Sequence, residues 1–92
     1  MLRPRFTGQF KKDIKTLDKS GKKDMEKLKY VMSKLIDGES LESRYHDHAL
    51  IGNLKGRRDC HIEPDWLLIY RLDRDAQQVT FVRTGSHADL FG

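Results

Sequence analysis

The sequence predicts a small α+β protein in which two N-terminal helices pack on a mainly antiparallel sheet. Two observations lead to this fold class. Apolar residues recur at helical spacing as far as residue 36, and short strand-like apolar runs with turn residues between them begin at residue 57. A chain of 92 residues is long enough for one hydrophobic core and too short for two independent cores. We therefore expect residues 1–92 to form a single domain.

The first elements are a short strand and a helix. Residues 2–6 are typical of a strand, and apolar residues from Phe6 to Leu17 then recur at helical spacing. Thr7 is a residue type that caps helix N-termini, and the Ser20-Gly21 pair predicts the end of this helix. The lysines between the apolar positions are expected to face solvent.

A second helix and a long loop follow. Apolar residues from Met25 to Ile36 form another stripe, and Gly38 marks the end of that helix. Residues 37–56 show little periodicity and contain three glycines, which predicts a connecting loop. Loops of this length in small domains are often functional, and this one carries His46, His48 and Lys55.

Three strands are expected in the second half of the chain. Residues 57–63 and 66–72 predict a hairpin joined by Pro64-Asp65, since proline presets its own φ and aspartate tolerates the next turn position. Residues 79–84 predict a third strand after the polar turn 73–78.

A two-residue hairpin loop fixes which residues share a face of the sheet. It would pair Glu63 with Trp66, His61 with Leu68 and Asp59 with Tyr70. The opposite, purely apolar face would carry Cys60, Ile62, Leu67 and Ile69. We expect the apolar face to lie under the helices and the mixed face to form the floor of a cleft.

Composition narrows the class of partner and the location. Eighteen Lys and Arg against 14 Asp and Glu give a net charge of +4 and a pI near 9.3, which favours nucleic acid or an acidic protein as partner. Cys60 is the single cysteine, so no internal disulfide forms and a reducing, cytoplasmic setting is expected. Neither a signal-peptide pattern nor an apolar run of about 20 residues is present, which argues against secretion and membrane insertion.

The candidate chemistry lies in the histidines. All four lie at or beyond the midpoint of the chain, at positions 46, 48, 61 and 87. Imidazole exchanges protons near neutrality, and two imidazoles meeting in one cleft with the Asp65 carboxylate would form an acid and base pair. RNA can be cleaved this way without a metal or a protein nucleophile: a base removes the 2′-hydroxyl proton, and an acid protonates the departing 5′-oxygen.

Other side chains suit an RNA substrate. Lys55 and Arg83 are cations able to hold a phosphate, and Trp66 and Phe91 are aromatic rings able to stack on unpaired bases. Each residue also has a structural alternative: Trp66 as a core or cleft-wall residue, Arg83 as a salt-bridge partner, Asp65 as a turn residue and the histidines as surface residues. We interpret His46 as a structural or surface histidine.

A zinc site is an alternative interpretation. His46, His48, His61 and Asp65 are all possible ligands. No cysteine joins them at a familiar spacing, and two histidines separated by one residue in a glycine-containing loop are a weak metal signature.

Longer motifs carry a family resemblance. DHAL at 47–50, LKGRRDCHIEPDWLLIY at 54–70 and RTGSHADLFG at 83–92 resemble the YafQ-type toxins of the RelE/ParE superfamily, as does KDMEKLKYVM at 23–32. The resemblance extends over nearly the whole chain. It implies the RelE/ParE-like α+β fold, with two N-terminal helices on a small, twisted, mainly antiparallel sheet.

The resemblance also implies an activity and its residues. Toxins of this type are ribosome-dependent endoribonucleases that cut mRNA in the A site, around lysine codons, without a metal or other cofactor. Carried over by motif, the catalytic residues are His48, His61, Asp65 and His87. Arg83 corresponds to an arginine near the scissile phosphate, and Phe91 to an aromatic residue at the substrate base. Leu54 and Arg57 stand where relatives often have aromatic residues, so codon preference carries over least directly.

The implied partners are the ribosome with its mRNA and a cognate DinJ-like antitoxin with a ribbon-helix-helix DNA-binding half. Operator DNA is bound only through the toxin-antitoxin complex, and no membrane is involved. Two alternative functions differ in their use of histidine. A ParE-like gyrase inhibitor would share the fold, and a non-catalytic module binding nucleic acid or antitoxin would need only a basic surface. Neither depends on His61 or His87, whereas the nuclease depends on both.

Overall fold

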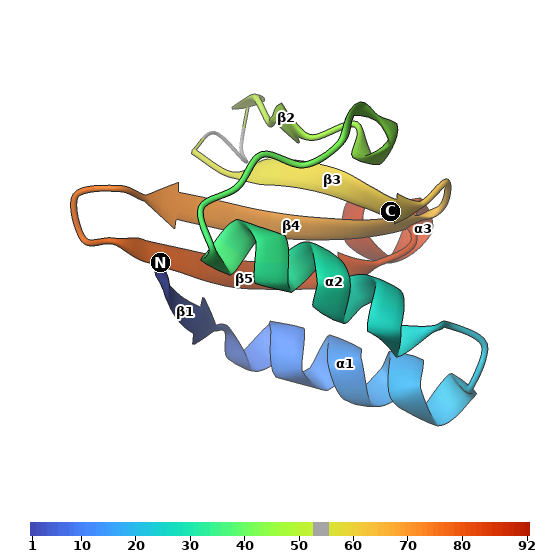
Figure 1. The fold of residues 1–92 in the computed structure, drawn as a ribbon. Coiled ribbons are helices and arrows are strands. Elements are labelled where there is room, and N and C mark those ends of the chain that lie inside the picture. Colours follow the sequence, from blue (N-terminus) through green and yellow to red (C-terminus); the bar gives the residue numbers. More distant parts are fainter. Residues whose placement is uncertain (53–55) are drawn as a thin grey trace.

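The computed structural model describes residues 1–52 and 56–92, so the predicted phosphate contact Lys55 lies outside the described residues. The elements in chain order are β1 (Arg3–Phe6), α1 (Gly8–Ser20), α2 (Met25–Ile36), the 3-10 helix η1 (Ser43–Tyr45), β2 (His48–Ala49), β3 (Arg58–Glu63), β4 (Trp66–Asp73), β5 (Gln78–Gly85) and α3 (His87–Phe91). The α+β class predicted from the sequence is confirmed (Figure 1).

The five strands form one sheet in the order β1-β5-β4-β3-β2. All neighbouring strands are antiparallel except β1, which pairs in parallel with β5 from Arg3 opposite Gln78 to Phe6 opposite Phe81. The first strand therefore adds to the sheet beside the last one. The sequence predicted the strand at residues 2–6 but not its partner.

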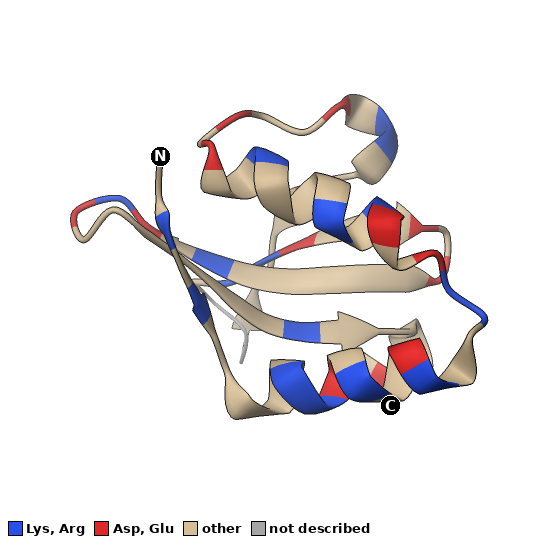
Figure 2. Cartoon of the chain, turned by 60° about the horizontal axis from the view of Figure 1, so that its bottom comes forward, with Lys and Arg blue, Asp and Glu red and all other residues tan. Residues whose placement is uncertain are grey.

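Both long helices begin and end at residues with the expected chemistry. The Thr7 side chain accepts from the Phe10 N–H, and Gly21 ends α1 in the left-handed region at φ 65°. Glycine adopts that conformation without the steric cost of a Cβ. Asp24 caps α2 by accepting from the Glu26 N–H. The lysines of α1 are exposed along its outer surface (Figure 2).

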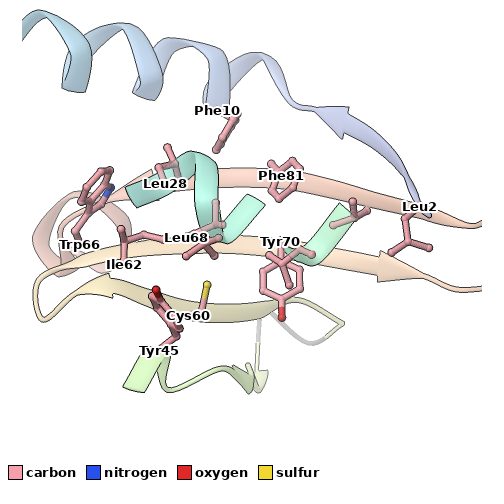
Figure 3. Close-up of a cluster of buried hydrophobic side chains, with 13 residues drawn as sticks. Leu2, Phe10, Leu28, Tyr45, Cys60, Ile62, Trp66, Leu68, Tyr70 and Phe81 are labelled. Atoms are coloured by element: carbon pink, nitrogen blue, oxygen red, sulfur yellow. The ribbon is translucent and has the colours of Figure 1, made fainter. Parts of the chain in front are cut away.

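One face of the sheet packs against α1 and α2 to form the core. Phe10 of α1 and Leu28 of α2 lie against Leu68, Tyr70 and other apolar residues of β3, β4 and β5, all almost inaccessible to solvent (Figure 3). Burial of this apolar area is the main source of stability for the fold. α3 lies on the other side of the sheet from α1 and α2 (Figure 1).

The predicted hairpin register is correct at the turn and wrong beyond it. Glu63 pairs with Trp66 as expected, but an irregularity between His61 and Glu63 makes His61 pair with Leu67 and Asp59 with Ile69. One extra residue in a strand turns every following partner to the other face. Trp66, Leu68 and Tyr70 therefore lie in the core under the helices, whereas Leu67 and Ile69 share the open face with His61 and Asp59.

The segment predicted as a loop contains more structure than expected. Residues 43–45 form η1 and residues 48–49 form β2, which pairs with the start of β3. The strand is too short to show a periodic pattern. Within residues 1–52 and 56–92, no helix is long and apolar enough to cross a membrane.

Candidate active site

Three of the predicted histidines come together on the open face of the sheet. His48 lies on β2, His61 on β3, and His87 is the first residue of α3. The His61 ring is central, with its centroid 5.5 Å from that of His87 and 6.5 Å from that of His48. His48 and His87 are 39 positions apart in the chain and yet lie near the same histidine, His61. They come together because β2 pairs with β3 and α3 lies against the open face of the sheet.

His87 is held by Asp65 of the hairpin turn. The Asp65 Oδ1 accepts from the His87 backbone N–H at 3.0 Å and lies 2.6 Å from its Nδ1. Because a carboxylate only accepts, Nδ1 carries the hydrogen and Nε2 is the nitrogen available to a substrate. The backbone and side-chain hydrogen bonds from His87 lower the pKa of Asp65 from its ordinary value. Asp65 is therefore both a turn residue and the partner that orients His87.

A capping box fixes the start of α3. The Ser86 side chain accepts from the Asp89 N–H, and the Asp89 side chain accepts from the Ser86 N–H, each at 3.1 Å. Such reciprocal bonds satisfy two N–H groups that a helix start leaves unpaired. They hold the backbone of His87 where Asp65 can reach it.

His48 is oriented by two contacts on opposite sides of its ring. Its Nδ1 lies 2.7 Å from the His46 carbonyl oxygen and must donate to it, since a carbonyl oxygen only accepts. Its Nε2 lies 3.3 Å from the Asp59 Oδ1. Two lone pairs at that distance repel, so a proton held by either His48 or Asp59 makes this contact favourable.

Asp59 is a buried carboxyl that the sequence interpretation did not select. Its exposed fraction is 3 %, and its Oδ1 has no hydrogen bond of good geometry within the described residues. Burial raises the pKa of Asp59 above its ordinary value, against the opposing charges of His48, His61 and His87. The available sequence signal was its position two residues before His61, on the same face of a strand.

His61 is the histidine whose environment favours the neutral form. Its burial lowers the pKa of the imidazole, and the neighbouring Asp59 carboxyl opposes this change. A neutral imidazole can accept a proton, which suits His61 to the role of a base.

His46 lies in the same cluster, which the sequence interpretation missed. Its ring centroid is 5.5 Å from that of His61, and its backbone has a left-handed φ of 50°, uncommon for a residue other than glycine. The signal was its spacing of two from His48, but the left-handed backbone of His46 itself breaks the strand period. His46 is therefore a candidate substrate contact in addition to an element of the loop.

The predicted substrate contacts differ in their accessibility. Phe91 is 46 % exposed, and its ring centroid lies 6.5 Å from that of His87. The Arg83 guanidinium donates from Nε and Nη2 to the Asp13 carboxylate at 3.1 and 3.0 Å, as its salt-bridge alternative predicted. Its side chain is still 32 % exposed.

The expected stacking role of Trp66 is wrong. Its ring is 0 % exposed, and its Nε1 donates to the Thr84 Oγ1 at 2.9 Å in the core. The register shift in the hairpin places it under the helices instead of on the open face. Trp66 therefore packs in the core against the end of β5, and its ring is not accessible to a nucleic-acid base.

An open cavity of about 900 Å³ adjoins the cluster. Its lining includes His46, His48 and His61 together with Tyr30 of α2 and Arg44 of η1. A cleft was expected above the polar residues of β3, and this cavity extends from them toward α2. It is large enough for a nucleotide-sized group.

The zinc alternative gains no support from the geometry. Within residues 1–52 and 56–92, no group of three or more His, Cys, Asp or Glu side chains is arranged to hold a metal ion. Cys60 lies in the core, and burial raises the pKa of its thiol, so it is not a thiolate ligand either.

Comparison with known protein families places the chain among the bacterial toxins of type II toxin-antitoxin systems, since residues 2–92 match the sequence model of one such family. That family is YafQ, and the chain belongs to it. The resemblance stated from the motifs is confirmed.

Individual relatives agree over most of their length. The mRNA interferase toxin YafQ of Escherichia coli strain K12 is 50% identical over 88 residues, which cover 95% of this chain and 92% of the relative. The crystal structure of YafQ from E. coli strain BL21(DE3) matches with a TM-score of 0.92 and 46% identity, and YafQ in the E. coli DinJ-YafQ complex with 0.88 and 47%. Both structural matches cover 100% of each chain.

Proposed function

We propose that this toxin is a ribosome-dependent endoribonuclease that cuts mRNA in the A site by metal-independent acid and base catalysis. The observation that carries the proposal is the pair of imidazoles His61 and His87, with centroids 5.5 Å apart on an open face. The E. coli relative named an mRNA interferase supports the same activity class.

The environments of the two histidines suggest how the work is divided. His61, whose pKa is lowered by burial, is the base that removes the proton from the 2′-hydroxyl. That oxygen attacks the adjacent phosphorus, and the bond to the 5′-oxygen breaks. His87 delivers a proton from Nε2 to the leaving oxygen, since its Nδ1–H is engaged by Asp65. This division of roles leaves no step that needs a protein nucleophile.

The remaining site residues complete the catalytic group or bind the substrate. His48, whose Nδ1 donates to the His46 carbonyl oxygen and whose Nε2 lies 3.3 Å from Asp59, is the third imidazole of the proposed catalytic group. Phe91 is placed to stack on a base next to His87. Arg83 and Lys55 are the proposed phosphate contacts, with Arg83 held in position by Asp13.

We further propose that a DinJ-like antitoxin with a ribbon-helix-helix half neutralises this toxin in the cytoplasm. The DinJ-YafQ complex formed by a relative 47% identical to this chain supports such a partner. Operator DNA would be bound through the antitoxin in that complex. No membrane is part of the proposal.

The deciding experiment is cleavage of an mRNA carried by purified ribosomes, compared with the same mRNA free in solution. Wild-type toxin should cut the ribosome-bound message at discrete positions in one reading frame and leave free RNA largely intact. His87→Ala should abolish these cuts, and Thr16→Ala on the exposed surface of α1 should not. A zinc-selective chelator, added while Mg²⁺ is kept constant for the ribosome, should leave the rate unchanged.

Other results would select another function. Equal cutting of free RNA would remove ribosome dependence, and loss of cutting with the chelator would restore a metal mechanism. Growth arrest without RNA cuts, unchanged in His87→Ala, would favour a gyrase inhibitor. Antitoxin binding by His87→Ala shows whether the variant is folded and makes its loss of activity interpretable.

A further inference from the structure

Asp47 stands between two histidines of the cluster but points to the other side of the sheet. Its Oδ1 accepts from the Tyr70 hydroxyl at 2.5 Å and from the Arg58 Nε at 3.3 Å. Arg58 and Tyr70 are direct cross-strand partners, so they share a face, and Tyr70 belongs to the core under the helices (Figure 3). The Asp47 side chain is therefore bound behind the sheet.

The adjacent His48 points to the open face. It pairs with Asp59 across β2 and β3, and successive residues of a strand alternate between faces. Asp47 and His48 are consecutive, so fixing the Asp47 backbone also fixes the His48 backbone. The bonds from Tyr70 and Arg58 to Asp47, on the helix side of the sheet, can therefore position the His48 imidazole on the open face without contacting a substrate.

The backbone at this point needs to be held. His46 has a left-handed φ of 50°, and such a conformation persists in a residue other than glycine when surrounding contacts fix it. Strand β2 spans only His48–Ala49 and supplies few backbone bonds. The two bonds to the Asp47 carboxylate tie this short segment to β3 and β4 behind the sheet, in addition to the contact between His48 and Asp59 in front of it.

The chemistry of Tyr70 makes the bond persistent. The ring is 1 % exposed, and burial together with the bond to Asp47 raises the pKa of the hydroxyl well above its ordinary value, against the opposing effect of Arg58. The hydroxyl therefore keeps its proton and remains a donor at neutral pH. Arg58 adds a permanent positive charge beside the Asp47 carboxylate.

We propose that Tyr70, Arg58 and Asp47, here called the Asp47 anchor, are positioning residues that hold His48 and His46 at the catalytic cluster. The anchor acts through the backbone of residues 46–48. None of its three side chains takes part in proton transfer. The kinetic part of this inference rests on the proposed nuclease function, whereas the effect on the His48 ring does not.

The test combines kinetics with NMR of the His48 ring. Tyr70→Phe removes one buried oxygen, Asp47→Ala removes the acceptor, and Asp47→Asn keeps an acceptor oxygen. The control is Asp73→Ala, which removes another carboxylate, one that accepts from the Ala76 N–H in the turn after β4. Cleavage on ribosomes gives kcat and KM, and nitrogen-detected NMR reports which ring nitrogen of His48 carries the hydrogen.

The expected results separate positioning from general stability. Tyr70→Phe and Asp47→Ala should lower kcat by about ten- to a hundredfold, the scale of a small misplacement of a reacting group. KM should rise by at most a few-fold, since His46 shifts while the proposed substrate contacts Phe91 and Arg83 stay in place. The wild-type Nδ1–H form of His48 should become a mixture of both tautomers, and Asp47→Asn should restore most of kcat and of the wild-type spectrum.

Three outcomes would overturn the inference. The first is wild-type kcat in both variants. The second is an unchanged His48 spectrum in folded protein, and the third is a loss of kcat equal to that of Asp73→Ala. If wild-type toxin cleaves no RNA, the proposed function fails, and the NMR comparison still tests the anchor. If Tyr70→Phe does not fold, the partly exposed Asp47 supplies the same comparison.

Discussion

The hydrogen bonds between Asp65 and His87 stabilise the turn between β3 and β4 and also orient a histidine of the candidate active site. Asp65 accepts from the backbone and from the ring of His87, so it sets the place of the helix start and the direction of Nε2. Replacing either residue affects the same imidazole. The two substitutions nevertheless have effects of different expected size, because His87→Ala removes the proposed proton donor and Asp65→Ala removes only the group that orients it.

We predict that His87→Ala lowers the cleavage rate by about 10²–10⁴-fold, the usual contribution of a general acid. Asp65→Ala should lower it less, since the imidazole is still present. The measurement is single-turnover cleavage on ribosomes between pH 5 and 8. Because the pKa of Asp65 is lowered, its carboxylate persists in this whole range and is lost only as the pH falls through that lowered value. An Asp65-dependent decline near pH 6 would contradict this assignment.

Asp59 predicts a conflict between stability and activity. Its pKa is raised in the folded protein by burial, so its stabilising contribution is present below the unfolded pKa of about 3.9 and is lost as the pH rises through the folded value. At pH 7 the charged carboxyl is a cost to folding. Asp59→Asn, which has nearly the same shape and no charge, should therefore raise Tm at pH 7 and lower the cleavage rate.

The measurement is thermal unfolding of wild type and Asp59→Asn at several pH values. A gain of 1 kcal/mol corresponds to about 4–8 °C in a domain of this size. The difference should shrink on acidification and vanish below about pH 4, where the wild-type carboxyl is protonated in both states. A constant difference at every pH would show that the effect is not linked to titration of Asp59.

At the level of single elements, α3 has five residues and carries both His87 and Phe91. A helix this short has little stability of its own and depends on its cap. Ser86→Ala should remove about 1 kcal/mol of local stability. We expect faster amide hydrogen exchange in α3 and a lower cleavage rate, with little change in the global Tm.

The matched control is Ser20→Ala. Its hydroxyl donates to the Leu17 carbonyl at the exposed end of α1, away from the cluster. This variant should leave cleavage and exchange in α3 unchanged. Equal activity of Ser86→Ala and wild type would mean that Asp65 alone is sufficient to hold the helix start.

The hairpin illustrates what sequence patterns predict and what they miss. Residues 57–63 and 66–72 were recognised as strands, and the turn pair Glu63 and Trp66 was correct. No glycine or other characteristic residue marks the irregularity after His61 in the sequence. A prediction based on strict alternation of side chains along the strands therefore placed Trp66 on the wrong face. Packing decides that question: the larger side chains Trp66, Leu68 and Tyr70 fill the core under the helices, while Leu67 and Ile69 are buried on the opposite face.

Candidate residues were predictable to a similar degree. His48, His61, His87 and Asp65 were named from chemistry and motif, and the structure brings their side chains into one group. Asp59 was overlooked because a carboxyl in a charged run looks like a surface residue, and its burial depends on β2, whose two residues show no pattern. His46 was set aside because a left-handed backbone cannot be read from a histidine.

Across the whole molecule, Asp13 links the two layers. Its carboxylate accepts from the Arg83 guanidinium and from the Thr84 N–H, and so joins α1 to β5. Burial alone would raise the pKa of Asp13, but these bonds and one from Gln9 lower it overall. The ionised form is therefore the one that supports the fold.

We predict that Asp13→Ala destabilises the protein by about 2–3 kcal/mol, since it leaves a partly buried guanidinium and a buried N–H without an acceptor. Urea unfolding at pH 7 measures this change. Asp18→Ala, on the exposed side of the same helix, is the control and should change stability by less than about 0.5 kcal/mol. A similar value for both variants would show that the link between layers contributes little.

The overall α+β class followed from the sequence, since helical and strand periods occupy separate halves of the chain. The position of β1 did not. Residues 3–6 pair in parallel with residues 78–81, and nothing in either short segment indicates the other as its partner. This distant pairing is favoured only once the rest of the sheet is formed.

That pairing has a consequence for the order in which the protein is made. β1 is synthesised first and must wait, unpaired, until more than seventy further residues have been added and β5 emerges. His87 follows β5, so a growing chain that already displays His48 and His61 still lacks the third imidazole. By the proposed mechanism, a nascent toxin therefore cannot attack the message from which it is being translated before β5 and His87 have been added.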